Sequence, residues 1–161
     1  MSPEVVSNAV RAYFEAIRAM DRQAWLNTFA EDAVSYDPVG ALPTKGHEKL
    51  GEFFQKITAA FKQVGLTEDQ IFVAGNEAAV KWTGRGVSKQ GRKVYFEGID
   101  TFEVNESGKI QTLHGYWNPA GCWGNFKILD LVRYILVPAF VGDPIPRLFE
   151  RSHQTCGQLA L

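Results

Sequence analysis

The sequence predicts an α+β fold in which three N-terminal helices pack on a mainly antiparallel sheet, followed by a C-terminal helical extension. Two observations predict the fold. Apolar side chains recur every three or four residues as far as Phe61, which is the helical period, and every second residue from Leu66 onward, which is the period of a strand. The segments between the expected strands are also short enough for hairpin turns. A chain of 161 residues is large enough to bury a core of its own.

The helices are marked by their starts and by their apolar stripes. Ser2, Pro3 and Glu4 form a helix start, because a hydroxyl caps the first turn and proline suits its first position. Asp21 is expected to cap a second, short helix that closes at Glu31 and Asp32. The apolar positions are Val6, Val10, Tyr13, Ile17 and Met20 in the first helix, Trp25, Leu26 and Phe29 in the second, and Leu50, Phe53, Phe54, Ile57 and Phe61 in the third.

One strand carries an acid on an apolar face. Strands are expected near residues 33–36, 67–74, 78–88, 93–104 and 109–117. Asp100 alternates onto the same face as Phe96 and Phe102, where an ionised carboxylate is costly. It is therefore expected to raise its pKa and stay neutral, or to find a cation. The alternative is a frayed or exposed strand on which Asp100 meets water.

A second acid, Asp37, stands directly before Pro38, and a residue in that place is pushed into an extended conformation. Asp37 is thus expected to end a strand. The segment that follows, as far as Gly46, is rich in turn residues and apolar residues. Asp37 is therefore expected to lie in apolar surroundings. The alternative is that Asp-Pro simply starts a turn and that Asp37 caps the local backbone. Trp117, at the end of the last strand, can likewise be core filling.

Composition and motifs exclude several functions. Seventeen basic and eighteen acidic residues give a net charge of -1. This balance provides no electrostatic basis for binding nucleic acid or an anionic membrane. Cys122 and Cys156 share no metal-ligand spacing, and phosphate loops, nucleophile elbows and dinucleotide fingerprints are absent from the sequence. With no basic leader and no apolar run long enough to span a membrane, a soluble cytoplasmic protein is expected. Beyond Trp117, an apolar extension is expected to cover the open end of the sheet or another subunit.

Tyr13, Asp37 and Asp100, in their sequence contexts, resemble the Δ5-3-ketosteroid isomerases, members of the cone-shaped, SnoaL-like fold superfamily of nuclear transport factor 2. The likeness covers roughly the first three-quarters of the chain. The other residues that carry it are Phe29-Ala30-Glu31-Asp32-Ala33, Pro38-Val39-Gly40, Pro43, Gly46, Asn76-Glu77-Ala78-Ala79, Gln90-Gly91-Arg92-Lys93, Ile99 and Gly108-Lys109.

The resemblance implies a curved sheet, a small apolar ketone as substrate, no cofactor, no metal and a homodimer. It implies that Asp37 is the general base, and that Tyr13 and a protonated Asp100 donate hydrogen bonds to the dienolate oxygen. The expected substrate-binding residues are Trp117, Phe54, Phe29, Val39, Trp82 and Phe102. Residues 1–118 are expected to form the isomerase-like domain and residues 119–161 to pack on it or on a dimer partner.

Two departures from the family pattern leave other functions open. Phe29 and Phe54 stand where many family members have tyrosines that support the oxyanion tyrosine, and the extension exceeds the usual family length. The alternatives are another enzyme of this fold, such as a polyketide cyclase or a dehydratase, and a non-catalytic protein that binds apolar ligands or dimerises with the extension in its cavity.

Overall fold

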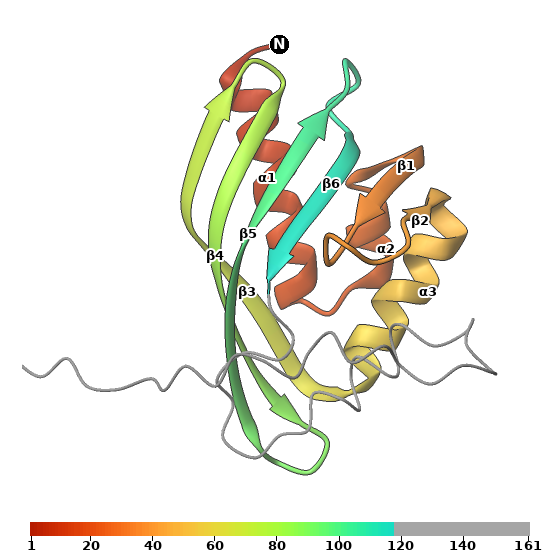
Figure 1. The fold of residues 1–161 in the computed structure, drawn as a ribbon, viewed down its shortest axis with the longest axis vertical. Helices are drawn as coiled ribbons and strands as arrows, with labels where there is room; N and C mark the ends of the chain where they lie inside the picture. Colours follow the sequence, from red (N-terminus) through yellow and green to blue (C-terminus); the bar gives the residue numbers. More distant parts are fainter. Residues whose placement is uncertain (118–161) are drawn as a thin grey trace, which may run out of the picture.

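A computed structural model describes residues 1–117 and confirms the α+β fold (Figure 1). The extension expected at residues 119–161 lies outside the described residues. The elements, in chain order, are α1 (Pro3–Arg18), α2 (Arg22–Leu26), β1 (Phe29–Tyr36), β2 (Thr44–Lys45), α3 (Gly46–Ala59), β3 (Phe61–Ala74), β4 (Glu77–Ser88), β5 (Lys93–Val104) and β6 (Ile110–Trp117).

The strands form one sheet in the order β2-β1-β6-β5-β4-β3. All neighbours are antiparallel except β1 and β6, so the sheet is mainly antiparallel, as the sequence predicts. Figure 1 shows that β3, β4 and β5 are long and curved, and that the helices cover one face of the sheet. We call this covered face the inner face.

Two predicted caps are confirmed. The Ser2 side chain accepts a hydrogen bond from the backbone N–H of Val5 at 3.4 Å, and Asp21 accepts one from Ala24 at 2.9 Å. Both caps satisfy N–H groups that a helix start otherwise leaves without partners. The helix between them, α1, buries Val6, Ala9, Val10, Tyr13, Phe14 and Ala16.

Two predicted element boundaries are wrong, because aromatic residues at helical spacing belong to strands. The second helix ends at Leu26, and Phe29 begins β1 instead of continuing the helix. The hydroxyl of Thr28 donates to the carbonyl of Trp25 at 2.7 Å, which satisfies a carbonyl at the helix end. Likewise, α3 ends at Ala59, and Phe61 begins β3.

Glycines on the inner face make room for large side chains of the next strand. Gly98 lies directly opposite Trp82 in the ladder between β4 and β5. A Cβ atom at Gly98 would lie only 2.5 Å from Cζ2 of Trp82 and 2.8 Å from Cβ of Trp117. Gly84 is similarly covered by the ring of Phe96. Strand glycines with this close an approach serve packing, since a side chain there would displace the aromatic ring.

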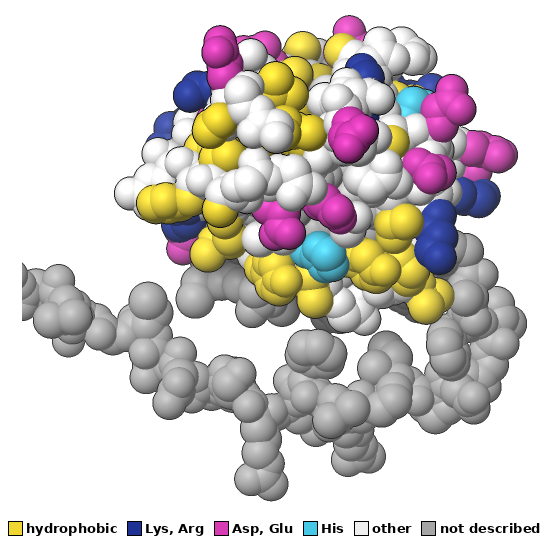
Figure 2. Space-filling view, turned by 90° about the horizontal axis from the view of Figure 1, so that it is seen from above, with side chains coloured by type: hydrophobic (Ala, Val, Ile, Leu, Met, Phe, Trp, Pro, Cys, Tyr) yellow, Lys and Arg dark blue, Asp and Glu magenta, His cyan; other side chains and the backbone are white. Residues whose placement is uncertain are grey.

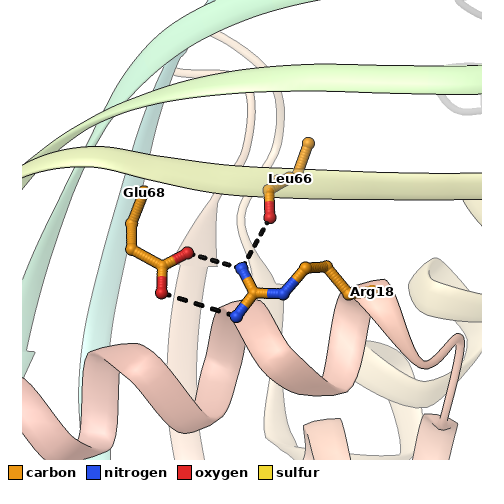
Figure 3. A network of polar contacts seen from close by, with 3 residues as sticks. All are labelled: Arg18, Leu66 and Glu68. Atoms are coloured by element: carbon orange, nitrogen blue, oxygen red, sulfur yellow. Dashed lines mark hydrogen bonds and ion pairs between the residues drawn. The ribbon is translucent and has the colours of Figure 1, made fainter.

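Arg18, near the C-terminus of α1, joins that helix to the sheet (Figure 3). Its guanidinium donates to the backbone carbonyl of Leu66 at 2.9 Å and pairs with the carboxylate of Glu68. Both partners lie on β3. A positive charge also suits the last turn of a helix. This contact therefore fixes the end of α1 that lies beyond Tyr13.

The surface agrees with the balanced composition. On the face seen in Figure 2, acidic, basic and hydrophobic side chains are interspersed. In the part of the chain that the structure describes, no helix is long and apolar enough to cross a membrane.

Candidate active site

The chain turns at Asp37, immediately after β1. The peptide bond between Asp37 and Pro38 is cis, and the backbone N–H of Val39 donates to the carbonyl of Gly115 on β6 at 2.8 Å. This bond holds the turn against the neighbouring parallel strand. The predicted position of Asp37 at the end of a strand is therefore confirmed.

Gly115 brings the two predicted acids together. It is paired with Asp100 in the ladder between β5 and β6. A Cβ atom at Gly115 would lie 2.5 Å from Oδ1 of Asp37 and 3.4 Å from Oδ1 of Asp100. The two carboxyl groups, 63 residues apart in the sequence (100 minus 37), thus lie over the same glycine. Any other residue at this position would push at least one of them away.

Asp37 is half-buried and held by Trp117, whose indole Nε1 donates to Oδ1 at 2.6 Å. Burial raises the pKa of the Asp37 carboxyl to about 6, while the hydrogen bond from Trp117 acts in the opposite direction. At neutral pH this group is therefore largely ionised, yet it is a much stronger base than an ordinary aspartate. A pKa near the working pH is what general base catalysis favours.

Asp100 is only 2% exposed, so the predicted burial is confirmed and the alternative of a water-exposed strand is wrong. Burial raises its pKa well above the ordinary value, and the negative charge of Asp37 raises it further. The nearby indole of Trp82 acts against this rise. Asp100 therefore stays protonated when Asp37 is ionised, and a protonated carboxyl group can donate a hydrogen bond.

Tyr13 is also buried, within a cluster of aromatic rings. Burial raises the pKa of its hydroxyl well above 10.0, the negative charges that Asp100 and then Asp37 carry when ionised are smaller causes, and Trp25 acts against the rise. Tyr13 is thus a neutral donor at all physiological pH values. The rings that contact it are Phe14, Trp25, Phe29 and Phe102, with centroid distances between 5.2 and 5.9 Å.

The other predicted site residues fall into two groups. Phe29, Phe54 and Phe102 are almost fully buried in the core. Phe29 and Phe102 pack against Tyr13, and Phe54 packs against Trp25. Val39 differs, because its side chain is 45% exposed, at the edge of the turn after Asp37. Trp82 is buried on the inner face beside Trp117.

Trp25 is the residue of this region that the sequence interpretation missed. It was predicted only as an apolar position of the second helix, whereas its ring contacts those of Tyr13, Phe29 and Phe54. A tryptophan among helix-stripe residues gives no signal of such a contact, because burial alone explains its presence. Its four-residue spacing from Phe29 predicts a helix through both residues, whereas α2 ends at Leu26 and Phe29 lies on β1.

Together, these groups combine one ionisable base with two neutral donors in an apolar setting. Such a set can remove a proton from a carbon acid and stabilise the negative charge that then develops on a neighbouring oxygen. Among residues 1–117, no three His, Cys, Asp or Glu side chains are grouped so that they could hold a metal ion.

Comparison with known proteins gives a family match and a relative. Residues 10–113 match a family model described as a SnoaL-like domain. The Steroid Delta-isomerase of Nocardioides simplex is 30% identical over 120 residues, which cover 74% of this chain and 94% of that protein.

Two solved structures extend the likeness. The Mycobacterium tuberculosis protein RV0760c is 28% identical, with a TM-score of 0.66 over 73% of this chain and 94% of that one, and has also been solved in complex with estradiol-17beta-hemisuccinate. A computationally designed 17-OHP binder is 28% identical, with a TM-score of 0.65 over 71% of this chain and 93% of that one. The expected cone-shaped fold is thereby confirmed.

Proposed function

The chain belongs to the SnoaL-like domain family, and from this premise we propose that it is a steroid delta-isomerase-like enzyme. The reaction would shift a C=C double bond into conjugation with a ketone. The observation that carries the proposal is the meeting of Asp37 and Asp100 over Gly115, because their surroundings leave one carboxyl group ionised and the other protonated. Two acids with separated pKa values have the division of labour that acid–base catalysis needs.

The proposed reaction needs only proton movement. The Asp37 carboxylate removes a proton from the carbon between the ketone and the double bond, and the electrons of that C–H bond form a dienolate. Tyr13 and Asp100 donate hydrogen bonds to the oxygen, which becomes negative only as the proton leaves. Asp37 then returns the same proton two carbons along, and the product is the conjugated enone. Nothing is oxidised or reduced, and the base is regenerated.

The relatives support an apolar, steroid-like substrate. The Nocardioides simplex relative is a steroid isomerase by name, and the two similar solved structures include one steroid complex and one designed 17-OHP binder. Aromatic side chains lie on the inner face beside the two acids, with Trp117 bonded to Asp37 and Trp82 close to Asp100. Flat apolar rings suit such walls better than a polar substrate does.

The test is formation of a conjugated enone from 5-androstene-3,17-dione, followed by absorbance. Asp37→Asn should lower turnover about a hundredfold to ten-thousandfold, the range for loss of a general base, and leave steroid binding nearly unchanged. Asparagine keeps an oxygen to accept the bond from Trp117. The matched control is Asp32→Asn, an exposed carboxylate on β1, the strand that Asp37 follows, which should retain full turnover. Equal turnover of wild type and Asp37→Asn would remove Asp37 from the mechanism.

A second candidate function is steroid binding without catalysis, which the similarity to a designed binder favours. The same assay separates the two functions. A folded wild-type protein that binds the steroid tightly but forms no enone would support the binder.

We also propose a homodimer, formed through the outer face of the sheet. Ile99 and Tyr116 are paired across β5 and β6 on that face, and both are about half exposed. Phe72 and Tyr95, on β3 and β5, are exposed as well. A second copy would cover this apolar surface. Light scattering during size-exclusion chromatography should give twice the chain mass for wild type, and Ile99→Lys should shift it to the monomer.

A further inference from the structure

Two buried tryptophans near the site have indole N–H groups without partners. Trp25 and Trp82 are each 2% exposed, and within the described structure neither Nε1 atom has a hydrogen bond. Buried donors without partners are rare in native proteins and call for an explanation. Oδ1 of Asp100 is a buried acceptor that is likewise unpaired.

The packing of Trp82 directs its N–H edge toward the strand of Asp100. Its atom Cζ2 lies 2.5 Å from the position of a Cβ at Gly98, and Cζ2 and Nε1 are both bonded to the same ring carbon. That edge of the indole therefore faces β5. Asp100 stands two residues after Gly98, on the same face of the same strand. An unpaired donor and an unpaired acceptor thus lie on neighbouring strands, on the same face of the sheet.

Trp25 stands in the same relation to Tyr13. The two rings lie 5.9 Å apart at an angle of 43°, and Phe29 and Phe54 also pack on the indole. Trp25 also lowers the pKa of the Tyr13 hydroxyl, as an N–H group directed at the oxygen does. The two phenylalanines have no hydroxyl, so neither of them can be the donor.

We propose that Trp25 and Trp82 are positioning residues that set the direction in which Tyr13 and Asp100 donate their hydrogen bonds. An indole nitrogen can only donate, whereas a phenol or a protonated carboxyl group can both donate and accept. A phenol oxygen that accepts the indole N–H must direct its own hydrogen elsewhere, and a protonated carboxyl group that accepts on one oxygen keeps the hydrogen of the other free to donate. Under the proposed function, the acceptor for that hydrogen is the substrate oxygen. The inference rests on the proposed function, because it assumes that the substrate presents an acceptor.

The arrangement gives each of the three acidic groups its own tryptophan. Trp117 donates to Asp37, Trp82 lies beside Asp100, and Trp25 lies beside Tyr13. The effect differs with the protonation state. On ionised Asp37 the indole occupies one oxygen and leaves the other to act as base. On the two neutral groups it leaves the hydrogen free for the substrate.

The simplest competing explanation is that both tryptophans only fill the core. The test therefore removes the N–H and keeps the ring. Each tryptophan is replaced in turn by β-(3-benzothienyl)alanine, an isostere with sulfur in place of N–H. The probe is 4-nitrophenol, whose ionised and neutral forms absorb at different wavelengths. The measurements are its dissociation constant and its ionised fraction when bound, at a pH below the pKa of the free probe.

We expect each isostere to weaken binding about threefold to tenfold, the effect of one hydrogen bond, and to lower the ionised fraction of the bound probe. In the steroid assay kcat should fall while KM stays nearly constant. The control is Phe14→Leu, a buried ring that contacts Tyr13 but carries no donor. It should lower thermal stability without changing the ionised fraction.

Wild-type affinity and spectrum in both isostere proteins would overturn the proposal, because the rings would then act through packing alone. A wild-type protein that ionises the bound phenol but produces no enone would contradict only the proposed function. A wild-type protein that does not bind the phenol would contradict the donor arrangement and both proposals with it.

Discussion

The two faces of β5 place a carboxyl group in opposite environments, one exposed to solvent and one buried. Glu97 points outward, where its side chain is 60% exposed and pairs with Lys81 at 2.6 Å. Three residues later Asp100 points inward, almost fully buried and with one oxygen unpaired. Both are carboxyl groups on one strand, and at Asp100 burial raises the pKa well above its ordinary value. Burial, and not residue type, makes a carboxyl group available as a neutral hydrogen-bond donor.

Among substitutions that compare the two faces of β5, the largest effect should come from removing the buried donor. Asp100→Leu keeps a side chain of similar size without polar atoms, and should lower kcat about a hundredfold to a thousandfold, as for loss of an oxyanion donor. Asp100→Asn should lose less, because its amide can donate to the substrate and still accept from Trp82. Steady-state kinetics on both variants measure this order. Equal losses in the two would mean that the Asp100 position acts through structure and not through a donor.

The next effect should come from filling the space over Gly115. A Cβ at this position would press on Oδ1 of Asp37 and disturb its bond with Trp117. Gly115→Ala should therefore lower turnover, and should cost about 1–3 kcal/mol of unfolding free energy, as overpacking does. Denaturant titration and the enone assay measure the two effects. The control is Gly75→Ala, at a turn where nothing lies within 4 Å, which should cost stability through its positive φ but leave turnover unchanged. Wild-type turnover in Gly115→Ala would contradict the placement of Asp37.

A further prediction concerns stability and pH. The pKa of Asp37 is about 6 in the folded protein and near 3.8 in the unfolded chain, so the folded state binds more protons between these values. Ionised Asp37 therefore lowers stability progressively as the pH rises through this range. Asp37→Asn removes the charge, so the variant should exceed wild type by about 1–3 kcal/mol near pH 7.5, and the gain should disappear near pH 3. A gain that does not vary with pH would show that ionisation is not its cause.

The smallest effect should come from the outer face. Glu97→Gln removes an exposed ion pair, which should change unfolding free energy by less than about 0.5 kcal/mol and leave turnover unchanged. Chemical denaturation at low and high salt measures it. A large loss of turnover would mean that the outer face takes part in the site. It would contradict the conclusion that only the inner face of β5 contributes to catalysis.

The sequence predicted most of the fold, because periodicity reports which face of an element is buried. It placed Asp100 on the inner face of its strand and Asp37 at a strand end, both of which are confirmed. The roles of Tyr13, Asp37 and Asp100 came from a resemblance and stay predictions, as do the domain boundary and the cytoplasmic location.

What the sequence could not predict are the contacts between distant elements. The bond from Trp117 to Asp37 joins residues 80 apart (117 minus 37), and the sharing of Gly115 by two acids depends on strand register. Trp25 was missed for the same reason, since the packing of α2 on α1 gives it its neighbour. The wrong assignment of Phe29 has a local cause, because four-residue spacing to the next aromatic is compatible with a helix even where a strand begins.

The central claim is that Asp37 is ionised and Asp100 protonated at the same pH. The most direct measurement is carbon-13 NMR of protein labelled at the aspartate carboxyl carbon, titrated from acid to alkaline pH, with Asp37→Asn and Asp100→Asn used to assign the two signals. We predict that the Asp37 signal moves near pH 6, while the Asp100 signal keeps its protonated position through neutral pH. If the Asp100 signal titrated at the ordinary pKa of an aspartate, the carboxyl group would not be a neutral donor and the account would be contradicted.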